Sequence, residues 1–218
     1  MKIKYLLLIA LALSLSVPMT AAEQKQAKKQ QTKQEQVIQK FIGWDKKLNT
    51  LDTVYVQETS FEGTLISKSL GHLYKVGTNL RLDTLEDGKI TQYAKTDKKI
   101  INIFDNKDNL IMQMDWESWR DNQQNKSLFD FNNYENILKK HDVKNFEITD
   151  ENYILTLTSK DENDGYILTF LLDKNNCFPK EINLTNEGVL SKTVLQDIKI
   201  NTTIPKEIFN EKRNDTGK

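Results

Sequence analysis

The stretch Leu51–Asp83, LDTVYVQETSFEGTLISKSLGHLYKVGTNLRLD, decides the fold of this chain. It opens with a strand pattern over residues 53–57, turns at Phe61-Glu62-Gly63, and continues with two extended runs over 70–76 and 79–83. β-Branched and aromatic residues separated by glycine-containing turns are typical of antiparallel hairpins. The stretch contains no catalytic constellation, so the apolar surface of its strands is the first candidate for a functional site.

The whole chain has the size and composition of one domain with tails. It has 218 residues, 38% of them hydrophobic, with 31 basic and 31 acidic side chains. This length is enough to bury a sizeable core. The formal charge of zero gives no indication of nucleic-acid binding. Cys177 is the only cysteine, which excludes an intramolecular disulfide, and its position in a turn favours a small, partly buried residue over a reactive or metal-binding thiol.

The N-terminus has the features of a signal peptide over residues 1–22. Two lysines precede an apolar run over residues 5–17, and small residues end the segment at Ala22. The run is too short for a membrane anchor. We predict cleavage after Ala22 and export without a lipid anchor, since no cysteine lies near this point. Residues 23–36 are rich in Gln and Lys, and we predict a solvated tether or a frayed extension of the next helix.

Residues 37–51 predict an amphipathic helix. Val37, Phe41, Trp44, Leu48 and Leu51 are spaced by 4, 3, 4 and 3 residues, which places them on one stripe. The short repeat favours a helix that packs on a sheet over a coiled coil.

From Thr53 to Trp116 the hydrophobic period changes to two, which predicts a series of hairpins. Near its end, Met112, Met114 and Trp116 alternate with polar or smaller residues. This strand face is interpreted either as ordinary core or as an adaptable lining for a flexible apolar ligand, because methionine accommodates varied shapes.

A polar segment over 117–126 interrupts the strands, and residues 127–141 predict a short helix. Its apolar side chains are at helical spacing, and basic residues fill its last turn. A helix that interrupts a meander must lie on a face or an end of the sheet, so it is a candidate lid. The expected lid residues are Phe131, Tyr134, Ile137 and Leu138. A second meander follows from Val143, which brings the total to about ten antiparallel strands and two or three helices.

The sequence lacks the common catalytic and nucleotide-binding motifs, including GxSxG, HExxH, GxxxxGK[ST] and GxGxxG. His72 and His141 are too isolated to indicate a triad or a metal site. The acidic run 161–165 has the composition of a calcium loop but not its ligand spacing, so we interpret it as a charged hairpin. We therefore predict no enzyme activity, no cofactor and no metal. The remaining enzymatic alternative is a secreted hydrolase that depends on His72 or His141.

Four motifs, in the same order and at similar spacing, resemble the periplasmic lipoprotein carriers of the LolA family. The motifs are Leu51-x-Thr53-x-Tyr55-x-Gln57, Gly71-His72-Leu73-Tyr74 followed by Leu80-Arg81-Leu82, Leu172-Asp173 followed by Phe178-Pro179-Lys180-Glu181-Ile182, and Ile200-Asn201-Thr202-Thr203-Ile204 followed by Phe209. The resemblance covers residues 37–210, and residues 211–218 remain as a tail.

The resemblance implies an incomplete, strongly curved antiparallel β-barrel of about 10–11 strands, with an N-terminal helix and a short lid helix over its open mouth. It also implies a lipid-binding cavity inside the barrel. We expect that cavity to be lined by Trp44, Leu48, Tyr55, Leu73, Leu80, Leu82, Ile103, Met112, Met114 and Trp116. Members of the family typically hold the lid shut with an arginine in an Arg-Pro pair. Here the corresponding loop, residues 75–79, lacks that pair, so Lys75 and Arg81 are the candidate latch residues.

The function implied by the resemblance is a monomeric periplasmic chaperone that carries lipoproteins from the inner to the outer membrane. Its implied partners are the acyl chains of lipoproteins, an inner-membrane lipoprotein-releasing ABC transporter and an outer-membrane receptor. The alternatives are a carrier of another lipid or glycolipid, and a regulatory domain of the same fold that senses lipoproteins.

Overall fold

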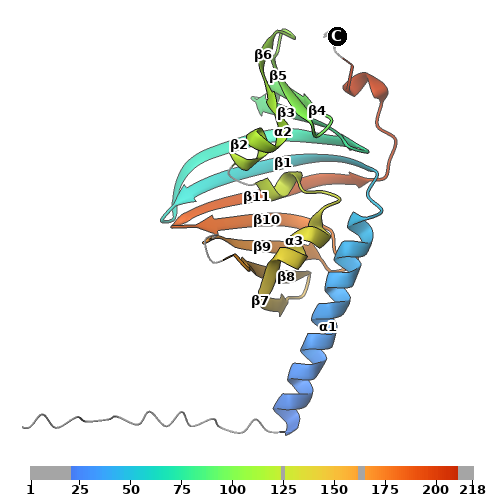
Figure 1. The fold of residues 1–218 in the computed structure, drawn as a ribbon, viewed down its shortest axis with the longest axis vertical. Coiled ribbons are helices and arrows are strands. Elements are labelled where there is room, and N and C mark those ends of the chain that lie inside the picture. Colours follow the sequence, from blue (N-terminus) through green and yellow to red (C-terminus); the bar gives the residue numbers. More distant parts are fainter. Residues whose placement is uncertain (1–20, 124–125, 162–164, 211–218) are drawn as a thin grey trace, which may run out of the picture. The chain divides into compact units, whose positions relative to one another are not determined.

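The computed structural model describes residues 21–123, 126–161 and 165–210 (Figure 1). The predicted tail, nearly all of the predicted signal peptide and the centre of the acidic run 161–165 lie outside the described residues. Contacts divide the chain between Glu35 and Gln36. The described part of the first unit, residues 21–35, is helical, so the predicted tether is helical there.

The second unit is built on one antiparallel sheet of eleven strands in the order β6-β5-β4-β3-β2-β1-β11-β10-β9-β8-β7. The strands are β1 (Thr50–Phe61), β2 (Thr64–Val76), β3 (Asn79–Glu86), β4 (Lys89–Thr96), β5 (Ile100–Asp105), β6 (Leu110–Asp115), β7 (His141–Ile148), β8 (Asn152–Ser159), β9 (Ile167–Asp173), β10 (Pro179–Asn186) and β11 (Val189–Ile200). The outer strands β6 and β7 are the two edges, so the sheet is open. This architecture confirms the predicted incomplete antiparallel barrel.

Tight turns and register shifts shape the sheet. Glu62-Gly63, Asp87-Gly88 and Glu187-Gly188 all have positive φ, as two-residue turns between twisted strands require. The turn predicted at Phe61-Glu62-Gly63 is confirmed. Six of the strand pairs, including β1 with β2 and β3 with β4, contain a register shift. Such bulges bend the strand that carries them, which accounts for the curvature of the sheet in Figure 1.

The helices differ in detail from the sequence prediction. They are α1 (Ala21–Asp45), α2 (Trp116–Asp121), η1 (Lys126–Phe129), α3 (Tyr134–Lys140) and η2 (Lys206–Ile208). Helix α1 ends at Asp45, six residues before the predicted end at Leu51, because Thr50 pairs with β2 and Leu51 pairs with both β2 and β11.

The region after β6 also departs from the prediction. The polar segment 117–126 interrupts the strands as predicted, but most of α2 lies in it. The Asp115 side chain caps this helix and accepts a hydrogen bond from the Ser118 backbone at 2.9 Å. Trp116 is the first residue of this helix and not the last residue of a strand. The single helix expected over 127–141 is two short helices, η1 and α3.

The core lies between the sheet and the segments that cross its concave face. Phe41 of α1 packs on Tyr134 of α3, with ring centroids 5.0 Å apart, and on Phe170 of β9, with centroids 5.2 Å apart. Val37 and Phe41 are buried as predicted from the helical stripe, and Leu48 and Leu51 are buried from outside the helix. A stripe that continues past the end of a helix can therefore still face the same core.

Candidate functional site

Strand register defines two rows of side chains on the concave face. One row is apolar, because Leu73, Leu82, Ala94 and Ile103 are cross-strand partners on β2 to β5, and Met112 of β6 continues it. The next row towards the β1–β2 turn joins Tyr55, Gly71, Thr84 and Gln92 on β1 to β4. Because alternate residues of a strand point to the same side, both rows face the core.

A cavity of about 310 Å³ lies against these two rows. Its lining comes from β1 to β5, α2, the residues after α2, and η1. The lining residues are Tyr55, Gln57, Ser69, Leu82, Thr84, Gln92, Tyr93, Ala94, Ile103, Trp119, Gln123 and Phe129. None of these twelve side chains carries a charge at neutral pH. The cavity therefore suits an uncharged group with both apolar and polar parts.

Helices α2 and η1 supply an aromatic wall for the cavity. The rings of Trp116 and Trp119 stack with centroids 5.4 Å apart, and Trp119 lies 5.3 Å from Phe129. Trp116 is buried, and this anchors α2 so that Trp119, one turn later, reaches the cavity. The polar segment 117–126 gave no hydrophobic pattern that could have revealed this wall.

Gly71 lets Tyr55 lie flat across the neighbouring strand. A Cβ atom at position 71 would be 2.3 Å from the Tyr55 ring carbon Cζ and hydroxyl oxygen, and 2.4 Å from the carbonyl oxygen of Asp83. No side chain fits at such distances. Burial and the charge of Asp83 raise the pKa of the Tyr55 hydroxyl to about 12, so it remains a neutral hydrogen-bonding group.

The segment before α3 is fastened to the end of α1 by hydrogen bonds. The Asp45 carboxylate accepts from the backbone N–H groups of Asn132 and Tyr134, at 2.7 and 3.1 Å. The Asn132 side-chain amide donates to the carbonyl oxygens of Asp45 and Leu48, at 2.6 and 2.9 Å. Lys98 donates to the carbonyl oxygen of Phe131 at 3.2 Å. We call the four hydrogen bonds that Asp45 and Asn132 make here the α1–α3 clasp.

Burial perturbs the acid–base chemistry of this clasp. Asp45 is only 2% exposed, and burial raises the pKa of its carboxyl group from 3.8 to about 6, against the opposing effect of its hydrogen bonds and of Lys75 and Lys98. Burial also lowers the pKa of the Lys75 ammonium from 10.5 to about 8. Asp45 could not be identified from the sequence, because a single aspartate near a helix end gives no pattern.

The structure brings some of the predicted cavity residues together. Tyr55, Leu82 and Ile103 line the cavity, whereas Leu48, Leu73, Leu80 and Trp116 are packed in the core, and Trp44 and Met114 pack against it. Met112 lies on an edge strand and is 48% exposed. Of the expected lid residues, Phe131, Tyr134 and Ile137 are buried and Leu138 is partly buried.

The candidate latch residues bond elsewhere. Lys75 is buried and donates to the carbonyl oxygen of Gly77. Arg81 lies on the opposite face of its strand from Leu82, where it pairs with Asp83 at 2.6 Å and donates to the carbonyl oxygen of Ile208 at 2.7 Å. The contacts of Lys75 and Arg81 therefore hold strand ends and the C-terminal segment. The bonds that reach the α3 region include those of the clasp, that of Lys98, and an ion pair between Lys46 and Glu135 at 2.7 Å.

The two histidines are each hydrogen-bonded through both ring nitrogens. His72 lies 2.5 Å from Asp52 and 3.1 Å from the hydroxyl of Tyr74. His141 lies 2.7 Å from the carbonyl oxygen of Ile137 and 2.9 Å from the hydroxyl of Tyr166. Neither cluster contains a serine or cysteine nucleophile, so these contacts give no support to a hydrolase.

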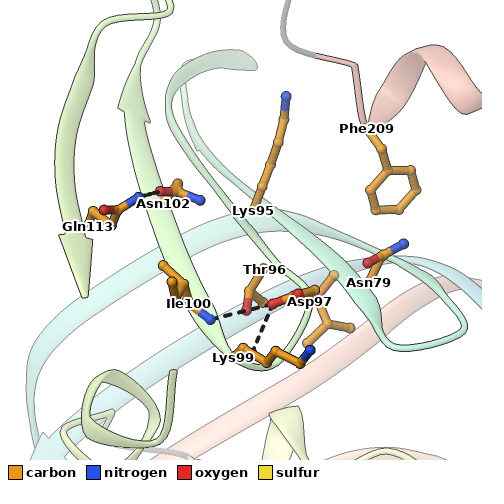
Figure 2. Close-up of a pocket in the computed structure, with 10 residues that line it drawn as sticks. Asn79, Lys95, Thr96, Asp97, Lys99, Ile100, Asn102, Gln113 and Phe209 are labelled. Carbon is orange, nitrogen blue, oxygen red and sulfur yellow. Dashed lines mark hydrogen bonds between the residues drawn. The ribbon is translucent and has the colours of Figure 1, made fainter. Parts of the chain in front are cut away.

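A second hollow, of about 470 Å³, lies at the ends of β3 to β6. Figure 2 shows Asn79 and Phe209 on one side of it and the hydrogen-bonded pair Asn102 and Gln113, 2.7 Å apart, on the other. Lys95, Asp97 and Lys99 also line it. Because charged side chains line this hollow, it is a poorer candidate for an apolar ligand than the cavity beneath α2.

Comparisons with known proteins identify the fold. No family model matches the chain, and no curated protein sequence matches it. Among solved structures, the chain is similar to MucB (TM-score 0.51, 16% identity, 79% of this chain and 60% of that one). It also matches a LolA superfamily protein from Nitrosomonas europaea (TM-score 0.45, 11% identity, 81% and 96% covered) and the lipoprotein LppX from Mycobacterium tuberculosis (TM-score 0.45, 9% identity, 78% and 94% covered). At these identities the comparisons concern the fold alone, and that fold is LolA-like.

Proposed function

We propose that this LolA-like chain is an exported, non-enzymatic carrier that binds the acyl chains of lipoproteins in the cavity beneath α2. The observation that carries the proposal is an uncharged cavity with an aromatic wall on the concave face of an open sheet. Ligand sites of proteins are typically concave, mostly apolar and furnished with a few polar groups. Among the described residues, no helix is long and apolar enough to cross a bilayer.

The energetics of acyl chains define what such a carrier must do. Each methylene removed from water contributes about 0.8 kcal/mol, so long acyl chains do not cross an aqueous compartment unshielded. Transfer from a bilayer to a protein cavity gains little, because both environments are apolar. Extraction therefore needs work from outside, and the sequence has no nucleotide-binding motif. An inner-membrane lipoprotein-releasing ABC transporter is the proposed source of that work, with an outer-membrane receptor as the proposed acceptor.

The cavity volume of about 310 Å³ is at the lower end of the range for ligand sites, about 300 to 1,000 Å³. We therefore assign the role of a lid to residues 126–140, which carry Phe129 of the aromatic wall and are fastened to α1 by the clasp. Displacement of this lid enlarges the cavity for a ligand with more than one acyl chain.

The test is lipoprotein release from inner-membrane vesicles whose lipoprotein-releasing transporter is supplied with ATP. The wild-type protein is expected to appear in a soluble complex with lipoprotein. Ala94→Phe, which fills the cavity, is expected to reduce this yield several-fold. Thr185→Phe is the matched control, because Thr185 is exposed on β10 and does not line the cavity. A wild-type protein that releases no lipoprotein under these conditions refutes the proposed function.

The alternative is a carrier of another lipid, or a domain that senses lipoproteins. The polar side chains in the cavity are the observation that favours a cargo with a polar head. Native mass spectrometry of the protein purified from its own envelope distinguishes these functions, because it weighs the bound ligand directly.

A further inference from the structure

One wall of the cavity is polar and uncharged. The cross-strand row that contains Tyr55, Thr84 and Gln92 presents hydroxyl and amide groups, and Gln57 and Ser69, which are partners on β1 and β2, lie beside it. The apolar row with Leu82, Ala94 and Ile103 lies directly next to this wall. The cavity surface is therefore divided in two. We call Leu82, Ala94 and Ile103 the apolar strip. The polar strip consists of Tyr55, Gln57, Ser69, Thr84 and Gln92.

The polar strip has unused hydrogen-bonding capacity. Within the described part of the chain, the side chains of Ser69, Thr84 and Gln92 have no hydrogen-bond partner. Gln57 makes one long bond, 3.4 Å from its amide nitrogen to the hydroxyl of Ser191. An amide both donates and accepts, and so does a hydroxyl group. These side chains can therefore bind a ligand group that carries oxygen atoms as acceptors, as donors or as both.

The absence of charge in the lining selects among polar ligands. A phosphate, carboxylate or ammonium group in this cavity would lose its hydration without meeting an opposite charge, and this is strongly unfavourable. A neutral ester, amide or hydroxyl group loses much less hydration and recovers it through hydrogen bonds. The ring of Trp119 adds a flat apolar surface that suits glyceryl or sugar C–H groups.

We propose that the polar strip binds the uncharged, oxygen-rich head of an amphiphile, either its glyceryl ester group or a neutral sugar, while the acyl chains lie along the apolar strip. This inference rests on the proposed function, since it requires that the cavity takes acyl chains. Beyond acyl-chain binding, the polar strip is expected to bind the head group of the ligand and to disfavour an anionic head group.

The experiment is displacement of a fluorescent fatty-acyl probe by three lipids with the same two acyl chains: diacylglycerol, monoglucosyl diacylglycerol and phosphatidic acid. The wild-type protein is expected to bind at least one neutral lipid about tenfold more tightly than phosphatidic acid. The double variant Thr84→Val/Gln92→Leu keeps the approximate size of both side chains and removes their hydrogen-bonding groups, so it is expected to lose this preference. Thr185→Val, at an exposed threonine of β10 outside the cavity lining, is the control and is expected to keep the preference.

The outcomes distinguish a failure of the head-group assignment from a failure of the carrier function. Tighter binding of diacylglycerol assigns the strip to a glyceryl ester, and tighter binding of the glucosyl lipid assigns it to a sugar. Equal affinity for all three lipids, or a preference that survives the double substitution, overturns this inference and leaves the carrier function intact. Failure of the wild-type protein to bind the probe or any of the three lipids overturns both.

Discussion

Replacement of Asp45 by asparagine tests whether the α1–α3 clasp depends on pH. In the wild-type protein the buried carboxylate accepts two backbone N–H groups from the segment before α3. The groups that face it are the ammonium of Lys75 from β2, that of Lys98 from the β4–β5 turn, and Tyr134 of α3. Asp45→Asn keeps the shape of the side chain and one acceptor oxygen but removes the titratable charge.

The magnitude follows from the pKa of Asp45, which folding raises from 3.8 to about 6. The folded protein thus holds the proton more tightly than the unfolded chain. The stability from this group is complete below pH 4 and falls as the pH rises through 6. A difference of about two pKa units corresponds to about 3 kcal/mol, since each unit is worth 1.36 kcal/mol.

The assay is chemical denaturation of the wild-type protein and of Asp45→Asn at a series of pH values from 4 to 8. The difference between their free energies of unfolding isolates Asp45 from the other titrating groups. We expect the wild-type protein to lose up to about 3 kcal/mol relative to the variant between pH 4 and pH 7. A difference that is constant over this range, or that moves in favour of the wild-type protein as the pH rises, refutes the reasoning.

Three further substitutions test the packing of the sheet and of the cavity. Gly71→Ala forces the Tyr55 ring away from β2, and we expect a loss of about 1–3 kcal/mol in chemical denaturation; an unchanged midpoint would contradict the close approach. Arg81→Ala leaves the buried carboxylate of Asp83 without its ion-pair partner, and we expect the free energy of unfolding to fall by about 3–5 kcal/mol. The double variant Arg81→Met/Asp83→Leu should recover most of this loss. A double variant as unstable as the single one would show that the ion pair itself stabilises the fold. Ala94→Leu narrows the cavity, so the affinity for a fluorescent acyl probe should fall while the far-UV circular dichroism spectrum is retained; unchanged affinity would place the acyl site elsewhere.

Local sequence signals were sufficient for the sheet. The glycine turns at Gly63, Gly88 and Gly188 and the period of two between them specify antiparallel hairpins, because each signal depends on a few neighbouring residues. The short helix α2 was not predicted, because polar residues surround its two tryptophans in the sequence and no hydrophobic period is visible there.

The cavity could be predicted only in part. The resemblance to the LolA family implied Tyr55, Leu82 and Ile103 as lining residues, and all three line the cavity. Gln92 and Ser69 resemble solvent-exposed strand residues in the sequence, and only the register between β1 and β4 places them beside the apolar strip. Register between strands depends on the whole sheet, so a single sequence gives little access to it.

The clasp and the small cavity together indicate how a lid over residues 126–140 responds to a ligand. Opening breaks the two bonds accepted by the Asp45 carboxylate and the two donated by the Asn132 side chain, and each contributes about 1 kcal/mol. Opening also exposes Phe131, Tyr134 and Ile137, which are buried in the closed form, at about 1.5–3 kcal/mol for each large apolar side chain. The sum is on the order of 10 kcal/mol, which keeps the open form far below about 0.1% of the unliganded protein. Burial of about twelve methylenes of an acyl chain from water offsets this cost. On the proposed function, a long acyl chain is therefore needed to hold the lid open, and the unliganded protein stays closed.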